Sequence, residues 1–321
     1  MSNIIEFPVF GIGPFGINPV ALDFVMPFIG WHVRIAWYGI FVTLGILSGI
    51  FYAFWRGQKN NGIAADDMID VAIFSIPAAI IGARLYYVLF SFGKFDSFYK
   101  IIAVWNGGLA VYGAIIFGFL TGFIVCKVKK LSILKVFDSG APAIMLGQII
   151  GRWGNFTNAE AFGVNTGLPW GMSINGRAPV HPIFLYECLW NLVGFIIINL
   201  AYKFNKKKFD GQIFLMYITW YGFGRMLIEG IRGEDTLMLG SFRVSQIVGF
   251  LCFVVGTMLI LTFISKYKLR KLEEAAYEGV YAAAQEKLAD GTRTDTDDNS
   301  SVEENFAETD NADVKSEDTE E

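Results

Sequence analysis

The chain has 321 residues, of which 54% are hydrophobic and only 17% are charged. A soluble domain carries charge on about a quarter of its residues, so this balance excludes an ordinary soluble protein and indicates a membrane protein. The formal net charge of −4 hides a basic body, residues 1–271 with 23 basic and 13 acidic residues, and an acidic tail, residues 272–321 with three basic and 17 acidic residues.

The N-terminal residues 1–24 have neither the basic start nor the small-residue cleavage site of a signal peptide, so we expect this segment to be retained at the membrane surface. Further along the chain, a helix that crosses a bilayer needs about 20 mostly apolar residues. Seven stretches meet that requirement, which predicts an all-α integral membrane protein with seven transmembrane helices in a domain of residues 1–267. The predicted spans are about 35–55, 68–92, 109–127, 134–153, 183–203, 212–230 and 243–265.

Basic residues gather in alternate connections between these spans. Dense groups of Lys and Arg follow the first, third, fifth and seventh spans, whereas the other connections hold few. Because Lys and Arg are enriched in cytoplasmic loops, we expect the N-terminus outside and the C-terminus in the cytoplasm. The longest connection, residues 155–182, then forms an outer-side loop region, and its many turn-forming residues predict ordered loop rather than helix.

Composition also predicts the segments outside the spans. Residues 95–108 are too short and too polar to cross a membrane, and we expect a re-entrant or interfacial helix there. Residues 268–285 are a possible surface helix, and residues 286–321, which are acidic and poor in apolar side chains, predict a disordered cytoplasmic tail. The three cysteines lie in separate apolar runs without a metal-ligand spacing, so no metal site is predicted.

Several ionisable side chains fall inside or at the ends of the predicted spans, where they are costly and by default functional. Tyr221, Arg225, Glu229 and Arg232 are spaced by four, four and three residues, which places them on one face of a helix. Together with Arg84 and Arg152, the arginines outnumber the nearby carboxylates of Glu160, Glu187 and Glu229. Since the planar guanidinium group suits phosphate, the residues alone predict a phospholipid-handling site in the outer half of the membrane.

Each of these residues also has a purely structural explanation. Arg225 and Glu229 could neutralise each other as an i,i+4 pair, and Arg152 could extend its guanidinium group from a helix end to the interface. Glu187 could pair with one of the arginines. Asp138 would most simply cap the start of its own span and favour the helix dipole there.

The stretch "GRWGNFTNAE", from Gly151 to Glu160, resembles the signature G-R-x-G-N-F-x-N-x-E of the prolipoprotein diacylglyceryl transferase family. Other motifs similar to those of the family occur in the family's order, and together they cover about residues 20–265. They are "AWYGIF" around Tyr38, "GARLYYVLF" in the second span, "VWNGGLAVYGA" before the third, "HPIFLYE" from His181 to Glu187 and "YGFGRMLIEGIR" from Tyr221 to Arg232.

This resemblance implies a multi-pass transferase of the bacterial plasma membrane that acts in lipoprotein biosynthesis. The family moves the diacylglyceryl group of phosphatidylglycerol to the thiol of the lipobox cysteine in a preprolipoprotein signal peptide, releasing glycerol phosphate. The implied partners are therefore phosphatidylglycerol, that signal peptide and other membrane lipids, with no nucleic acid. The family needs no cofactor.

The resemblance also implies which residues bind the lipid. We expect Arg152 to bind the phosphate, and Asn155 and Asn158 to donate amide N–H groups to the phosphate or to the headgroup glycerol. Glu160 would orient Arg152 or contact the headgroup. The remaining predicted pocket residues are Tyr38, Tyr221 and Arg232.

Four residues are predicted to serve the chemical step. Arg225 would be a second phosphate clamp, oriented by Glu229, because a leaving phosphate gains charge in the transition state. The thiol must also lose its proton. Many relatives carry a histidine, proposed as the base, where this chain has Tyr112, and a tyrosine of ordinary pKa is a poor base at neutral pH. His181 also occupies a motif position, so the identity of the base stays open.

Two alternatives to this function come from the residues. Buried arginines would also suit a transporter of lipids or anionic solutes, although the sequence has no internal repeat of the kind that many transporters show. A different lipid-dependent transferase with the same phosphate clamp is the second alternative.

Overall fold

The computed structural model describes residues 2–28, 30–91, 95, 97–104, 107–204, 206–233, 238–240 and 242–291. The chain divides into two compact units, residues 1–264 and 265–321, and the first unit contains all the predicted site residues. Its helices are α1 (Trp37–Asn61), α2 (Ala65–Phe90), α3 (Phe98–Ile102), α4 (Val111–Val128), α5 (Ile133–Asn158), α6 (Ile183–Lys203), α7 (Gln212–Glu229) and the first part of α8 (Val244–Gly291).

Each of the seven predicted spans coincides with a helix, and six of the described helices are long and apolar enough to cross a membrane. The six are α1, α2, α4, α5, α6 and residues 244–285 of α8. Helix α7 is not among them because its 18 residues include Arg225 and Glu229, which lower its apolar content. The protein is thus a membrane protein with several apolar helices, and the least apolar of the predicted spans is the one that carries the polar stripe.

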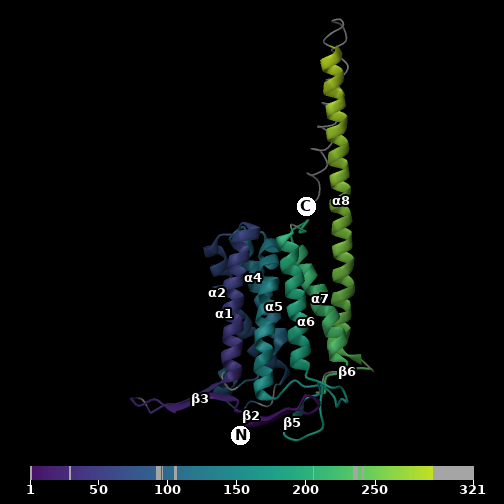
Figure 1. Cartoon of the computed structure of the whole chain (residues 1–321). Coiled ribbons are helices and arrows are strands. Elements are labelled where there is room, and N and C mark those ends of the chain that lie inside the picture. Colours follow the sequence, from purple (N-terminus) through teal and green to yellow (C-terminus); the bar gives the residue numbers. More distant parts are fainter. Residues whose placement is uncertain are drawn as a thin grey trace. The chain divides into compact units, whose positions relative to one another are not determined.

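Glycines allow α1 and α5 to pack closely, as their small-residue spacing indicates. A Cβ atom on Gly45 would lie 3.0 Å from the carbonyl oxygen of Gly147, and one on Gly49 would lie 3.0 Å from that of Ala143. Helix α5 also packs against α6 and α7, and Figure 1 shows these helices side by side. Helix α5 is therefore the central element of the bundle.

Short strands lie at the end of the bundle where α1 begins and α5 ends (Figure 1). Strand β1 (Asn3–Phe7) pairs with β2 (Ile12–Ile17) and with β5 (Ser173–Ile174), which belongs to the long connection between α5 and α6. Strands β3 (Val20–Val25) and β4 (His32–Ala36) form a separate antiparallel pair that leads into α1. The sequence analysis did not anticipate these strands. They tie the N-terminal segment to the loop through a small core that contains Ile5 and Ile174.

The remaining segments depart from the sequence analysis in detail. Within 95–108 the described helix is the five-residue α3, and residues 268–285 belong to α8 rather than to a separate helix. Strands β6 (Met238–Leu239) and β7 (Phe242–Arg243) form a hairpin before α8. Of the predicted tail, residues 286–291 are the last residues of α8, and residues 292–321 lie outside the described part of the chain.

Candidate functional site

Glu187, near the start of α6, lies among three arginines from two other parts of the fold. Its carboxylate forms ion pairs with Arg152 of α5, with Arg225 Nη1 of α7 at 3.2 Å and with Arg232 Nη1 at 3.6 Å. Glu187 is only 7% exposed. The sequence analysis considered Glu187 only as a possible ion-pair partner, whereas here it is the carboxylate that joins the arginines.

Glu229 is the second carboxylate of this arginine cluster, which we define as Arg152, Glu187, Arg225, Glu229 and Arg232. Glu229 Oε2 lies 2.9 Å from Arg225 Nη2 and 3.8 Å from Arg232 Nη1. Glu229 is 1% exposed, and its Oε1 atom accepts no hydrogen bond within the described structure. Such an oxygen is unusual, because most buried polar atoms have a hydrogen-bond partner.

Helix α7 ends at Glu229, so Arg232 lies just beyond the helix rather than on its last turn. Arg243 of β7 holds this end of α7 in place. Its Nη1 donates to the carbonyl oxygen of Glu229 at 2.7 Å and its Nη2 to that of Arg232 at 2.6 Å. A cation on the last carbonyls of a helix is favourable. The sequence analysis missed Arg243. The only indication in the sequence was that a basic residue begins the predicted last span.

The end of α5 carries the polar residues of the signature motif. Arg152 Nη1 donates to Asn155 Oδ1 at 3.3 Å, and Asn155 Nδ2 donates to Glu160 Oε1 at 2.9 Å. Asn158 Nδ2 donates to the same Glu160 oxygen at 3.5 Å. Ala159 closes the helix in the left-handed conformation, with φ of 51°, which turns Glu160 back toward both amides. Glu160 therefore contacts Arg152 through Asn155 rather than directly.

The three predicted tyrosines differ in their relation to the arginine cluster. Tyr221 lines a small cavity of about 20 Å³ together with Glu187 and Arg225. Tyr38 of α1 packs on α5, where a Cβ atom on Gly154 would lie 2.9 Å from its ring. Tyr112, at the start of α4, is 49% exposed and its ring lies 6.3 Å from that of Tyr86.

His181 and Arg84 make their contacts elsewhere. His181 Nδ1 lies 3.1 Å from the hydroxyl of Tyr186, which also accepts a hydrogen bond from Trp170 Nε1. Arg84 donates to the carbonyl oxygens of Lys100, Ile101, Gly107 and Gly108. Including Arg84 in the arginine surplus was therefore wrong, because its donors are used by the segment between α2 and α4.

The arginine cluster holds three guanidinium groups against two carboxylates, which leaves one formal positive charge among partly buried side chains. Such a charge at low dielectric attracts an anion strongly. The fork geometry of arginine allows two parallel hydrogen bonds to a phosphate. Chemically, the arrangement can bind a phosphate group and stabilise negative charge that develops on it.

Comparison with known proteins agrees with this chemistry. The family model described as prolipoprotein diacylglyceryl transferase matches residues 25–262. A phosphatidylglycerol–prolipoprotein diacylglyceryl transferase of Finegoldia magna is 43% identical over 228 residues, which cover 71% of this chain and 90% of that protein. Proteins of the same name from Clostridioides difficile and Bacillus licheniformis are 40% and 39% identical, over 75% and 76% of this chain and 96% and 92% of theirs.

Proposed function

Because the chain belongs to the prolipoprotein diacylglyceryl transferase family, we infer that it is a transferase that moves the diacylglyceryl group from phosphatidylglycerol to prolipoprotein. This transfer is the first step of lipoprotein maturation. The observation that carries the inference is the family match over residues 25–262, which includes the complete arginine cluster. A transporter of lipids or anions has no comparable support.

We further propose that the protein lies in the bacterial plasma membrane with seven spans, the N-terminus outside and the C-terminus in the cytoplasm. The alternation of basic connections supports this topology. Helix α7 would be the sixth span in chain order and would complete the set of seven, tolerated despite its charges because Arg225 pairs with Glu229 and with Glu187 of α6. The arginine cluster then lies in the outer half of the bilayer.

The lipid phosphate is bound, in this proposal, between Arg152 and Arg225. The two arginines already share Glu187, so their guanidinium groups are held close together before a lipid enters. Asn155, Asn158 and Glu160 form the wall at the end of α5 and contact the headgroup glycerol, while Tyr38, Tyr221 and Arg232 complete the pocket. Preorganised donors of this kind cost little reorganisation during the reaction.

The chemical step is an alkyl transfer from oxygen to sulfur. The thiolate of the lipobox cysteine attacks C3 of the lipid glycerol, a C–S bond forms, and the C3–O bond breaks. The bonding electrons leave on the phosphate oxygen, and glycerol phosphate is released. Since the leaving group gains charge at that moment, Arg152 and Arg225 bind the transition state more tightly than the substrate.

A direct assay tests this function. Purified protein in lipid bilayers receives phosphatidylglycerol and a peptide that contains a lipobox cysteine. We expect the peptide to gain the mass of one diacylglyceryl group while glycerol phosphate accumulates in equal amount. Peptide that stays unmodified while the lipid demonstrably binds would contradict the proposal and favour a different lipid-dependent reaction.

The role of Arg152 is tested by Arg152→Lys, which keeps the positive charge but loses the fork. We expect the transfer rate to fall at least about tenfold, which corresponds to about 1.4 kcal/mol of transition-state stabilisation. The matched control is Arg56→Lys, since Arg56 is a buried arginine that contacts Tyr52, Asn60 and Asn199 instead of the cluster. Equal activity losses per folded molecule in both variants would mean that Arg152 has no special part in the reaction.

The proton acceptor is tested at Tyr112 and His181 separately. We expect Tyr112→His to retain or improve transfer, because imidazole is the better base near neutral pH. We expect His181→Gln to lower the transfer rate no more than it destabilises the connection between α5 and α6. The reason is that the described side-chain contacts of His181 are to Tyr186 rather than to the arginine cluster. A folded but inactive Tyr112→His protein would mean that Tyr112 does something a histidine cannot, and a His181→Gln protein inactive at unchanged stability would point to His181 as the base.

A further inference from the structure

A buried aspartate connects the starts of α5 and α7, far along both helices from the arginine cluster. Asp138 of α5 has no exposed surface. Its Oδ2 accepts a hydrogen bond from Gly211 N at 2.8 Å, and its Oδ1 accepts one from Phe214 N at 2.9 Å. Asp138 therefore caps α7, whose own N-cap residue is a glycine without a side chain. The prediction that Asp138 caps its own helix was wrong.

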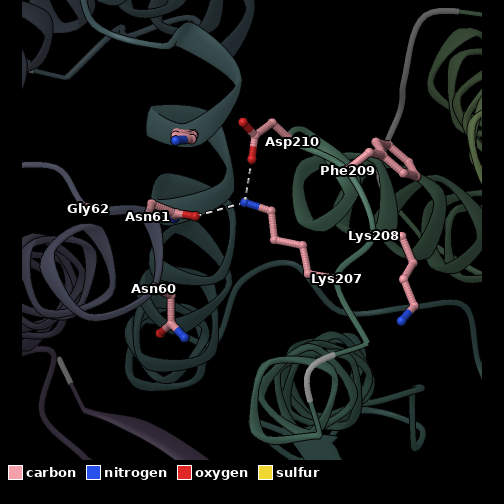
Figure 2. Close-up of a pocket in the computed structure, with 8 residues that line it drawn as sticks. Asn60, Asn61, Gly62, Lys207, Lys208, Phe209 and Asp210 are labelled. Carbon is pink, nitrogen blue, oxygen red and sulfur yellow. Dashed lines mark hydrogen bonds and ion pairs between the residues drawn. The ribbon is translucent and has the colours of Figure 1, made fainter. Parts of the chain in front are cut away.

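Side chains of Lys207 and Asn61 complete this contact between α5 and the start of α7, which we call the junction. Lys207 Nζ lies 2.8 Å from Asp138 Oδ2, 3.0 Å from Asp210 Oδ1 and 2.8 Å from Asn61 Oδ1. Figure 2 shows Lys207 reaching between Asn61 and Asp210 at the edge of a cavity of about 460 Å³. The buried carboxylate thus has both a countercharge and hydrogen-bond donors, which a buried charge requires.

The junction and the arginine cluster are the same distance apart on both helices. Arg152 follows Asp138 by 14 residues on α5, and Arg225 follows Gly211 by 14 residues on α7. At about 1.5 Å per residue, each arginine lies about 21 Å along its helix from the junction. A slip of α7 by one turn would move Arg225 by about 5.4 Å. That displacement exceeds its 3.2 Å distance to Glu187.

We propose that Asp138 is a positioning residue for the transfer reaction. By holding the first N–H groups of α7 against α5, it sets the register at which Arg225 meets Glu187 and faces Arg152. Asp138 touches neither substrate, so it acts through the placement of Arg225. This inference rests on the proposed function, in which Arg225 stabilises the leaving phosphate.

The test compares Asp138→Ala with Tyr202→Phe in the full chain, in bilayers that contain phosphatidylglycerol. Tyr202 donates to the carbonyl oxygen of Asp138 at 3.0 Å, so its variant loosens α6 on α5 without touching the cap of α7. We expect Asp138→Ala to lower kcat at least about tenfold with a smaller change in KM for the lipid, because Arg152 still binds the ground state. We expect Tyr202→Phe to keep kcat within about twofold, since it leaves both capping hydrogen bonds of Asp138 to α7 in place.

A double variant separates the effect of the capping hydrogen bonds from the effect of the Asp138 and Lys207 charges. Asp138→Asn with Lys207→Met removes both charges but leaves an amide oxygen that can accept from Gly211 or Phe214. We expect this variant to recover kcat to within about threefold of the wild type, because one capping bond persists. If Asp138→Ala fails to fold, the double variant tests the inference in its place. A folded double variant whose kcat is tenfold below that of the wild type would overturn the inference.

The register of α7 relative to α5 is measured by an experiment that does not depend on transfer activity. Spin labels at positions 153 and 227, near the ends of α5 and α7, replace Trp153 and Leu227 in a chain whose three native cysteines are changed to alanine. We expect Asp138→Ala to shift their mean separation by several ångströms and Tyr202→Phe to leave it unchanged.

Wild-type separation and wild-type kcat in Asp138→Ala would overturn the inference, as would an equal loss of kcat in Tyr202→Phe. A wild-type protein that transfers nothing would instead refute the proposed function. In that case the spin-label separation still decides whether Asp138 sets the register of α7.

Discussion

At the scale of single residues, Glu187 connects the three arginines of the cluster. It is the one carboxylate in the described structure that contacts Arg152, Arg225 and Arg232 together. Without its charge, three guanidinium groups would remain near one another with Glu229 as the remaining carboxylate of the cluster. Removing one partner of a buried ionic network is far more costly than removing an exposed one.

We therefore expect Glu187→Gln to lower the free energy of unfolding by about 3 kcal/mol and to reduce transfer, because the arginines lose their common partner. Thermal unfolding and the peptide assay measure the two effects. The control is Lys129→Met, which removes ion pairs of a partly exposed lysine to Asp67 and Asp70 and should destabilise the protein much less, because solvent screens exposed ion pairs. Equal destabilisation of both variants would mean that Glu187 is not an essential partner.

At the scale of elements, two tryptophans set how α6 and α7 meet. The rings of Trp190 and Trp220 stack at 4.4 Å, and each indole Nε1 donates to the backbone carbonyl oxygen of the other, at 3.0 and 2.9 Å. Each ring also lies over a glycine of the opposite helix, Trp190 over Gly224 and Trp220 over Gly194. This reciprocal contact lies next to Glu187 and Arg225 and keeps the two helices close enough for their ion pair.

Gly224→Ala tests this contact, because its Cβ atom would overlap the Trp190 indole ring at Nε1. We expect the helices to separate, the free energy of unfolding to fall by about 1–3 kcal/mol, as overpacking usually costs, and transfer to fall with it. Gly140→Ala on α5 is the matched control, since nothing lies within 4 Å of its Cβ position and alanine favours a helix. A Gly224→Ala protein as stable as Gly140→Ala would show that the tryptophan contact adapts at no cost.

At the scale of the whole molecule, the site belongs entirely to the unit of residues 1–264. The family match also ends at residue 262, before the acidic tail. The net charge of the chain comes from that tail, whereas the arginine cluster and the basic connections after the first, third and fifth predicted spans belong to the first unit. The chemistry of transfer therefore has no evident need for the tail.

Removal of residues 286–321 should leave transfer within about twofold of the full chain, because surface changes away from the packed core have small effects. The peptide assay on the truncated protein checks this, with its thermal unfolding midpoint as the control for folding. A folded, truncated protein with strongly reduced transfer would assign the tail a part in substrate delivery.

By itself, the sequence determined where the long apolar helices lie and which polar residues they carry. The requirement for about 20 apolar residues is local, so the spans could be placed from composition alone. The spacing of Tyr221, Arg225 and Glu229 on one helix face is local too, and the Arg225–Glu229 ion pair at 2.9 Å confirms it. The motif from Gly151 to Glu160 likewise folds on itself, through the hydrogen bonds of Asn155 and Asn158 to Glu160.

Only the tertiary structure decided which polar groups meet across helices. Arg84 and Arg152 look alike in sequence, yet Arg84 binds backbone carbonyl oxygens and Arg152 joins Glu187. Asp138 caps α7 although α5 carries it. Partners of this kind are far apart in the chain and are chosen by the packing and register of helices. Hydropathy, which each residue contributes without regard to its neighbours in space, contains no information about that choice.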